Sequence, residues 1–214
     1  PLRLVGSEMC IRDRLNSNEN WEPQNYNEKF AGPIRLRQGL AKSKNLVAIR
    51  VLKHIGADYA QDYISRFGFN PKKHPPYLSM ALGVGEVSAM EMVTAYSVFA
   101  NGGYLKKPYF IEKIIDTKGR KVKLSNELMN AEVPRIIDPR NAFIMTDMLK
   151  EVINSGTAKR AKRLKRSDIA GKTGTTNNLI DAWFAGYNPD IVTVTWMGYP
   201  QPKPLGKKET GSRA

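Results

Sequence analysis

The sequence predicts an α/β fold in which helices pack on both faces of an antiparallel sheet. Apolar residues recur at helical spacing through the first two-thirds of the chain, and three strand-like segments follow one another near its end. The connectors between these segments are too short for crossovers, so neighbouring strands are expected to be antiparallel. With 214 residues, of which 41% are hydrophobic, the chain is long enough to bury a core.

The helices are predicted from apolar spacing together with start and stop signals. A polar, looping stretch from Leu15 to Leu40 leads into a short helix. A glycine stops each of the next two helices, a Ser88–Glu91 capping box starts the fourth, and an Asp138-Pro139 start precedes the last. The longer helices expected from these signals are Leu46–Ile55, Tyr59–Phe67, Ser88 to about Asn101, and Asp138 up to Gly156.

The strands are predicted from alternating or apolar runs bounded by turn residues. Tyr109–Asp116 and Lys121–Leu124 are expected to form a hairpin at the sheet edge or in a surface insertion. The main sheet is expected from Asp168–Thr175, Ala182–Asn188 and Ile191–Tyr199, with a turn at Asn188-Pro189-Asp190.

Composition and charge exclude several classes of protein. The longest apolar runs fall far short of the ~20 residues that cross a bilayer. The single cysteine, Cys10, permits no internal disulfide, and with only two histidines a structural metal site is not expected. Lys and Arg exceed Asp and Glu by 14, a balance that attracts polyanions such as nucleic acid, anionic lipid or an anionic polymer.

The first fourteen residues differ from the rest. Met9-Cys10-Ile11-Arg12-Asp13 is similar to the translation of a transposase adapter used in preparing DNA libraries. We therefore interpret residues 1–14 as a cloning or assembly scar and residues 15–214 as a partial domain.

Gly171-Lys172-Thr173-Gly174-Thr175 is the first candidate functional motif. A phosphate-binding loop is excluded because Arg166 stands where its first glycine is required and because strands, not a helix, follow. On an edge strand, Lys172 would place a positive charge beside a site, and Gly174 would let a substrate backbone lie against the strand. Thr173 and Thr175 would offer hydroxyls to an anionic group. The alternative is a plain strand end with a solvated lysine.

Ser43-Lys44-Asn45, between two expected helices, is the second candidate motif. A short turn here can present a hydroxyl and an amide side by side, whereas the simpler interpretation is a helix N-cap formed by Ser43. Ser-x-Asn followed by Lys-Thr-Gly matches, in order, two of the three signatures of the penicilloyl-serine transferases.

The longer sequence around these motifs resembles one family, the transpeptidase domain of class A, bifunctional penicillin-binding proteins. It is most like the 1A type of Gram-negative bacteria. The resemblance runs from about Asn16 to the end of the chain. It is carried by Trp21–Asn25, Phe30–Pro33, Leu36–Asn45, Ala81–Val87, Phe99–Gly103, Ile169–Asn177 and Asp181–Tyr187.

The resemblance implies a serine-type D,D-transpeptidase that crosslinks peptidoglycan stem peptides by acyl transfer and is trapped by β-lactams. It implies that Ser43 and Asn45 relay protons and orient the acyl chain, and that Lys172 assists Ser43. Thr173 and Thr175 would hold the substrate carboxylate along Gly174, and the Thr175 N–H would form part of the oxyanion hole. It also implies a membrane-anchored parent protein on the periplasmic side of the inner membrane and no cofactor.

One departure from the family pattern concerns the nucleophile. No serine of this chain has a lysine three positions later, so Ser-x-x-Lys, which the family places upstream of Trp21, is missing. The chain is interpreted as a fragment cut at both ends and expected to be inactive alone. We nevertheless expect Ser43, Asn45, Lys172 and Thr175 to converge on one cleft.

Two other interpretations stay open. A non-catalytic scaffold or regulatory fragment of the same family would account for the missing Ser-x-x-Lys. The basic run from Lys159 to Arg166 allows a nucleic-acid-binding module, although no base-reading motif accompanies it, and specific nucleic-acid binding is not expected.

Overall fold

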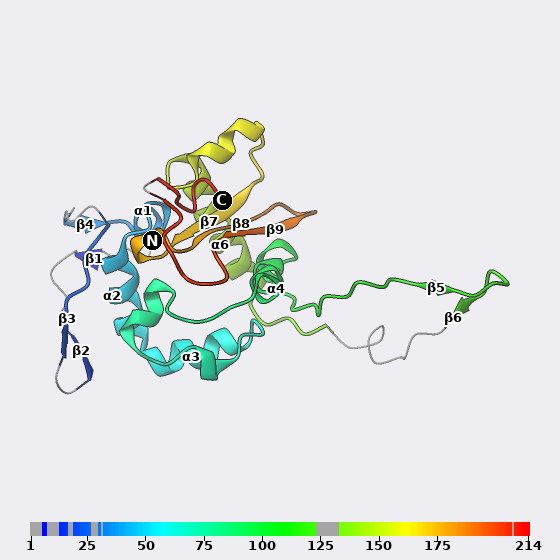
Figure 1. Cartoon of the computed structure of the whole chain (residues 1–214), viewed down its shortest axis with the longest axis horizontal. Helices are drawn as coiled ribbons and strands as arrows, with labels where there is room; N and C mark the ends of the chain where they lie inside the picture. The colour runs from blue at the N-terminus through cyan, green and yellow to red at the C-terminus, as the bar shows by residue number, and fades with distance from the viewer. Residues whose placement is uncertain are drawn as a thin grey trace.

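The computed structural model describes residues 6–7, 13–16, 19–26, 30, 32–122, 133–206 and 208–214, and its centre is a three-stranded sheet (Figure 1). The strands β7 (Ala170–Thr175), β8 (Ala182–Tyr187) and β9 (Val192–Met197) lie in the order β7-β8-β9, and both pairs are antiparallel. The β8–β9 turn is closed by Asn188, whose N–H donates to the Ile191 carbonyl. The expected α/β class and antiparallel sheet are confirmed.

Two helices pack on this sheet and on each other. The helix α4 (Ala89–Ala100) contacts β8 and β9, and α6 (Pro139–Asn154) contacts β7. Leu149, Val152 and Ile153 of α6 form one buried cluster with Ala170 and Tyr187 of the sheet. Burying a large aliphatic side chain stabilises a fold by about 1.5–3 kcal/mol, so this cluster fixes β7 against α6.

The N-terminal part of the described chain contributes three further helices. These are α1 (Leu36–Ala41), α2 (Asn45–Ile55) and α3 (Ala57–Ser65). The helix α1 packs against α6, where Arg37 forms an ion pair with Asp147. Among the described residues, no helix is long and apolar enough to cross a membrane.

The helix start and stop signals expected from the sequence are present in the structure. Ser88 and Glu91 form both bonds of the capping box, and the Asp138 carboxylate accepts the Arg140 N–H at the start of α6. Gly56 ends α2 with φ 92°, a conformation that favours glycine.

The remaining elements are short. They are β1 (Gly6–Ser7), β2 (Asp13–Asn16), β3 (Glu19–Trp21), β4 (Pro33–Ile34) and the 3₁₀ helices η1 (Pro71–Lys73), η2 (Leu78–Leu82), η3 (Lys159–Leu164) and η4 (Asn177–Leu179). Most of the stretch interpreted as a scar lies outside the described residues, and that interpretation stays a prediction.

The expected hairpin forms a surface insertion that projects far from the sheet (Figure 1). Only β5 (Ile114–Ile115) and β6 (Lys121–Val122) pair, and the expected strand end at 123–124 lies outside the described residues. A bridge between Tyr104 and Arg135 closes the base of this arm. The pairing is brief because Ile114, Ile115 and Val122 are all exposed and the two strands have no buried face.

Candidate active site

The Lys172 ammonium and the Ser43 hydroxyl lie in contact at one edge of the sheet. Lys172 Nζ donates to Ser43 Oγ at 2.8 Å and to the Thr173 carbonyl at 2.7 Å. In the described part of the chain, β7 pairs with β8 alone, so its other edge is free to receive an extended ligand. The two motifs recognised in the sequence therefore meet beside an open strand edge.

The backbone at Ser43 explains how its hydroxyl reaches Lys172. The Ser43 N–H donates to the Leu40 carbonyl at 3.0 Å and the Lys44 N–H to the Gly39 carbonyl at 2.9 Å, the two bonds of a Schellman motif at the end of α1. Ser43 occupies the left-handed position of that motif with φ 50°. This position favours glycine, and a serine here adopts a strained backbone that turns its side chain toward β7.

The simpler interpretation of Ser43 as a helix N-cap is wrong. The N-cap position of α2 is occupied by Lys44 and not by Ser43. Since the Ser43 hydroxyl accepts from Lys172, the Ser43 side chain contacts the sheet and not the helix that follows it.

Asn45, the first residue of α2, lies two residues beyond Ser43 and is held by the segment before α1. Its Nδ2 donates to the Gln24 carbonyl at 2.8 Å. The neighbouring Asn25 is buried, and its Oδ1 accepts the Leu46 N–H. These bonds fasten residues 24–25 to the start of α2 and fix the Asn45 amide near the Ser43 turn.

The two threonines of β7 have different surroundings. Thr173 is 8% exposed, and its hydroxyl lies 2.5 Å from that of Thr157. Thr175 is exposed at the end of the strand, where its Oγ1 accepts the Gly211 N–H at 3.0 Å. Of the two, Thr175 faces the solvent side where a ligand could bind. The carboxylate-binding role of both threonines stays a prediction.

Thr157 and Gly211 were not identified from the sequence. Gly211 lies so close to the sheet that a Cβ on it would come within 2.3 Å of the Gly174 and Trp183 carbonyl oxygens. Each of these residues contacts the site from a distant part of the chain, and neither belongs to a local pattern that marks it.

Burial changes the acid–base behaviour of the site. It lowers the pKa of Lys172 from 10.5 to about 8, because the protein replaces water that would stabilise the ammonium. Lys172 is therefore charged at neutral pH but loses its proton more readily than an exposed lysine. Such a group can donate a proton and recover it near physiological pH.

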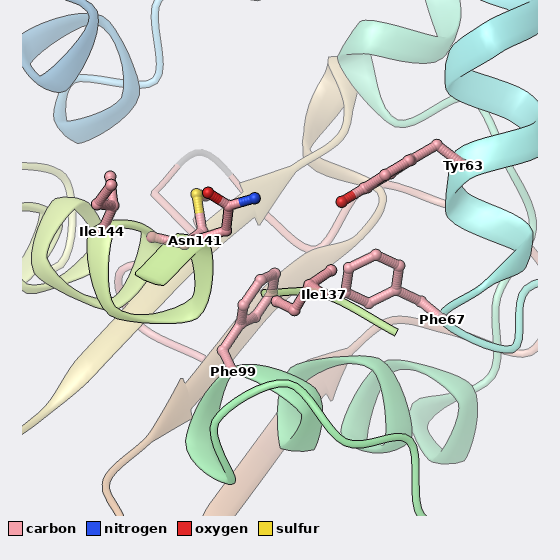
Figure 2. A pocket seen from close by; sticks show the side chains of 7 residues that line it. Tyr63, Phe67, Phe99, Ile137, Asn141 and Ile144 are labelled. Atoms are coloured by element: carbon pink, nitrogen blue, oxygen red, sulfur yellow. The ribbon is translucent and has the colours of Figure 1, made fainter. Parts of the chain in front are cut away.

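A separate apolar pocket of about 320 Å³ lies between α3, α4 and α6 (Figure 2). Its lining includes none of the motif residues and consists of Tyr63, Phe67, Phe99, Ile137, Asn141, Ile144 and Met145. The pocket is therefore not formed by the residues of the Ser43–Lys172 contact.

Comparisons with known proteins identify the family of this chain. A family model described as the penicillin binding protein transpeptidase domain matches residues 11–214. Penicillin-binding protein 1A of Neisseria lactamica is 50% identical over 192 residues, which cover 89% of this chain and 24% of that protein. The corresponding protein of Pseudomonas aeruginosa is 41% identical over an alignment of 237 positions, which covers 89% of this chain and 29% of that protein.

Solved structures give the same result. Penicillin-binding protein 1A from Haemophilus influenzae has a TM-score of 0.91 and 33% identity, over 98% of this chain and 36% of that chain. The chain thus spans about a quarter of the length of the curated relatives it matches. On the family match over nearly its whole length, the chain belongs to the transpeptidase domain family of the penicillin-binding proteins.

Proposed function

We propose that this chain forms the substrate-binding side of a periplasmic peptidoglycan D,D-transpeptidase that also binds β-lactams. The observation that carries the proposal is the 2.8 Å contact between Lys172 Nζ and Ser43 Oγ beside the free edge of β7. The nucleophilic serine would come from a Ser-x-x-Lys segment, which the sequence of this chain does not contain.

The contact suits the proton transfer that acyl transfer requires. When a serine hydroxyl gives its proton to a neighbouring base and its oxygen bonds to the penultimate D-alanine carbonyl carbon, the bond from that carbon to the terminal D-alanine nitrogen breaks. The nitrogen must then gain a proton. Because the Ser43 hydroxyl accepts from Lys172, its own proton is free to be donated, and the Lys172 ammonium can replace it.

The substrate would lie along β7. The exposed Thr175 hydroxyl and the positive charge of Lys172 would hold the terminal carboxylate, and the Thr175 N–H would stabilise the oxyanion. Peptidoglycan stem peptides and β-lactams both supply such a carboxylate and an acyl carbon. One fold relative, PonA1 from Mycobacterium tuberculosis, was solved in complex with penicillin V, and we extend that ligand class to this chain.

Covalent labelling with a fluorescent penicillin tests the proposal. The chain alone should not label, since activation of a serine needs a neighbouring base. The same chain preceded by a relative's Ser-x-x-Lys segment, here named the extended protein, should label. If the extended protein folds and stays unlabelled, the proposed function is wrong and a scaffold role is favoured.

Within the extended protein, we predict that Lys172→Ala lowers the acylation rate by ~10²-fold or more, the usual effect of removing a preorganised electrostatic group. Lys172→Arg should rescue only part of it, because a planar guanidinium gives up no proton. The control is Lys106→Ala, an exposed lysine outside the motifs. Acylation of Lys172→Ala at the rate of this control would contradict the assigned role.

A further inference from the structure

Thr157, in the connection between α6 and η3, contacts both halves of the site at once. Its N–H donates to the Ala41 carbonyl at 3.1 Å, and its hydroxyl lies 2.5 Å from the Thr173 hydroxyl. Ala41 ends α1 two residues before Ser43, and Thr173 follows Lys172 on β7. One residue outside both motifs therefore links the backbone that carries each of them.

These contacts form a closed ring. Starting from Ser43, the ring passes through Lys172 Nζ to the neighbouring Thr173, crosses to Thr157 and returns through the Ala41 carbonyl to the Ser43 turn. Each link is a hydrogen bond or a few covalent bonds along the backbone. In a closed ring of this kind, the distance between any two members depends on every link.

The neighbouring residue, Gly156, brings the ring together. A Cβ at Gly156 would lie 2.1 Å from the Ala41 carbonyl oxygen and 2.8 Å from Val152 Cα. No real Cβ makes such contacts, so a side chain at 156 would push the end of α1 away. Ala41 and Thr173 are themselves buried, at 1% and 8% exposure, which keeps water from competing for the Thr157 bonds.

We infer that Thr157 is a positioning residue for acyl transfer, which holds the Ser43 turn against β7 and so sets the Ser43–Lys172 distance. The inference rests on the proposed function only for its kinetic consequence. Proton transfer requires heavy atoms within about 2.6–3.2 Å, so a small displacement of the Ser43 turn would slow it. Thr157 itself would touch neither the substrate nor the transferred proton.

Three substitutions distinguish the hydrogen bond of the Thr157 hydroxyl from the packing of the Thr157 side chain. Thr157→Val keeps the shape and removes the bond to Thr173, whereas Thr157→Ser keeps a hydroxyl. Thr146→Val is the matched control, because Thr146 also bonds a hydroxyl of the sheet, that of Tyr187 at 2.9 Å, but from α6 and away from the motifs. In the extended protein, we expect penicillin acylation to fall ~10-fold in Thr157→Val and less than ~2-fold in the other two.

A second measurement uses the chain as it stands and needs no acylation. Since burial lowers the pKa of Lys172 to about 8, loosening of the ring should admit water and raise that pKa toward 10.5 in Thr157→Val. The NMR titration of the Lys172 Cε resonance reads this value. Thr157→Ser and Thr146→Val should titrate as the wild type does.

The outcomes distinguish this inference from the proposed function. An unchanged pKa of Lys172 in a folded Thr157→Val chain overturns the inference, whatever the extended protein does. A raised pKa in that chain, while the extended protein fails to label, supports the positioning role and contradicts the transpeptidase proposal. If Thr157→Val does not fold, Thr173→Val removes the same hydrogen bond from its other end. The pKa of Lys172 measured in the Thr173→Val chain then supports or overturns the inference by the same criterion.

Discussion

Ser43 combines a strained backbone with a hydroxyl that accepts a hydrogen bond from Lys172. A residue other than glycine in the left-handed region costs roughly 1 kcal/mol, and such strain persists where the surrounding structure and function require it. The sequence motif identified Ser43 as a candidate. The local pattern could not reveal its φ of 50°, because the Schellman motif at the end of α1 is expected to carry glycine at that position.

We predict that Ser43→Gly is about 1 kcal/mol more stable than Ser43→Ala, because both variants lose the hydroxyl and only glycine relieves the positive φ, and that both lose the function proposed for the site. Urea unfolding measures the first effect, and penicillin acylation of the extended protein measures the second. Ser155→Gly is the control, because Ser155 ends α6 with a φ of −132° and gains nothing from glycine. Equal stabilities of Ser43→Gly and Ser43→Ala would show that the serine backbone is not strained.

Lys172 gives the chain a specific dependence of stability on pH. Its pKa is about 8 in the fold and near 10.5 when unfolded, so between these values the unfolded chain binds more protons. The contribution of this group to the free energy of unfolding therefore rises with pH through that window and is constant below it.

We expect wild type to gain about 1–3 kcal/mol relative to Lys172→Met between pH 8 and pH 10.5. Urea unfolding of both proteins across this range measures the difference. The exposed Lys106→Met serves for comparison and should follow wild type at every pH. Parallel stability curves for wild type and Lys172→Met would mean that the ammonium is as well solvated in the fold as in the unfolded chain.

At the scale of elements, the sequence predicted what local signals determine. The capping box at Ser88, the proline start at Pro139 and the stop at Gly56 each act within a few residues, and each is present in the structure. The arm between Tyr104 and Arg135 was harder to predict. Its apolar residues read as strands, but a strand needs a partner or a core to cover it, and Phe110 is 90% exposed.

The Ser88 cap provides a test of whether such a local signal stabilises its helix. We predict that Ser88→Ala destabilises the chain by about 1 kcal/mol, because the Glu91 N–H loses its acceptor and the reciprocal bond to the Glu91 carboxylate loosens. Thermal unfolding followed by circular dichroism measures it. Ser65→Ala removes a hydroxyl that bonds back onto its own helix, and we expect a change within about 0.5 kcal/mol.

For the molecule as a whole, family resemblance predicted more than local pattern did. The antiparallel order of β7, β8 and β9 followed from short connectors, and the approach of Ser43 to Lys172 followed from two motifs that act together in one family. Thr157 and Gly211 escaped prediction because each contacts the site through backbone and side-chain geometry that only the packed chain creates.

The hydrogen bond at the centre of the site joins residues that stand 129 positions apart. Helices such as α2 and α4 form from contacts between near neighbours, on a timescale of about a microsecond. The Ser43–Lys172 contact must first close a loop through most of the chain, and the entropy lost in that closure delays it. The Ser43–Lys172 contact therefore assembles late in folding, and a nascent chain that has not yet emerged as far as β7 lacks this site.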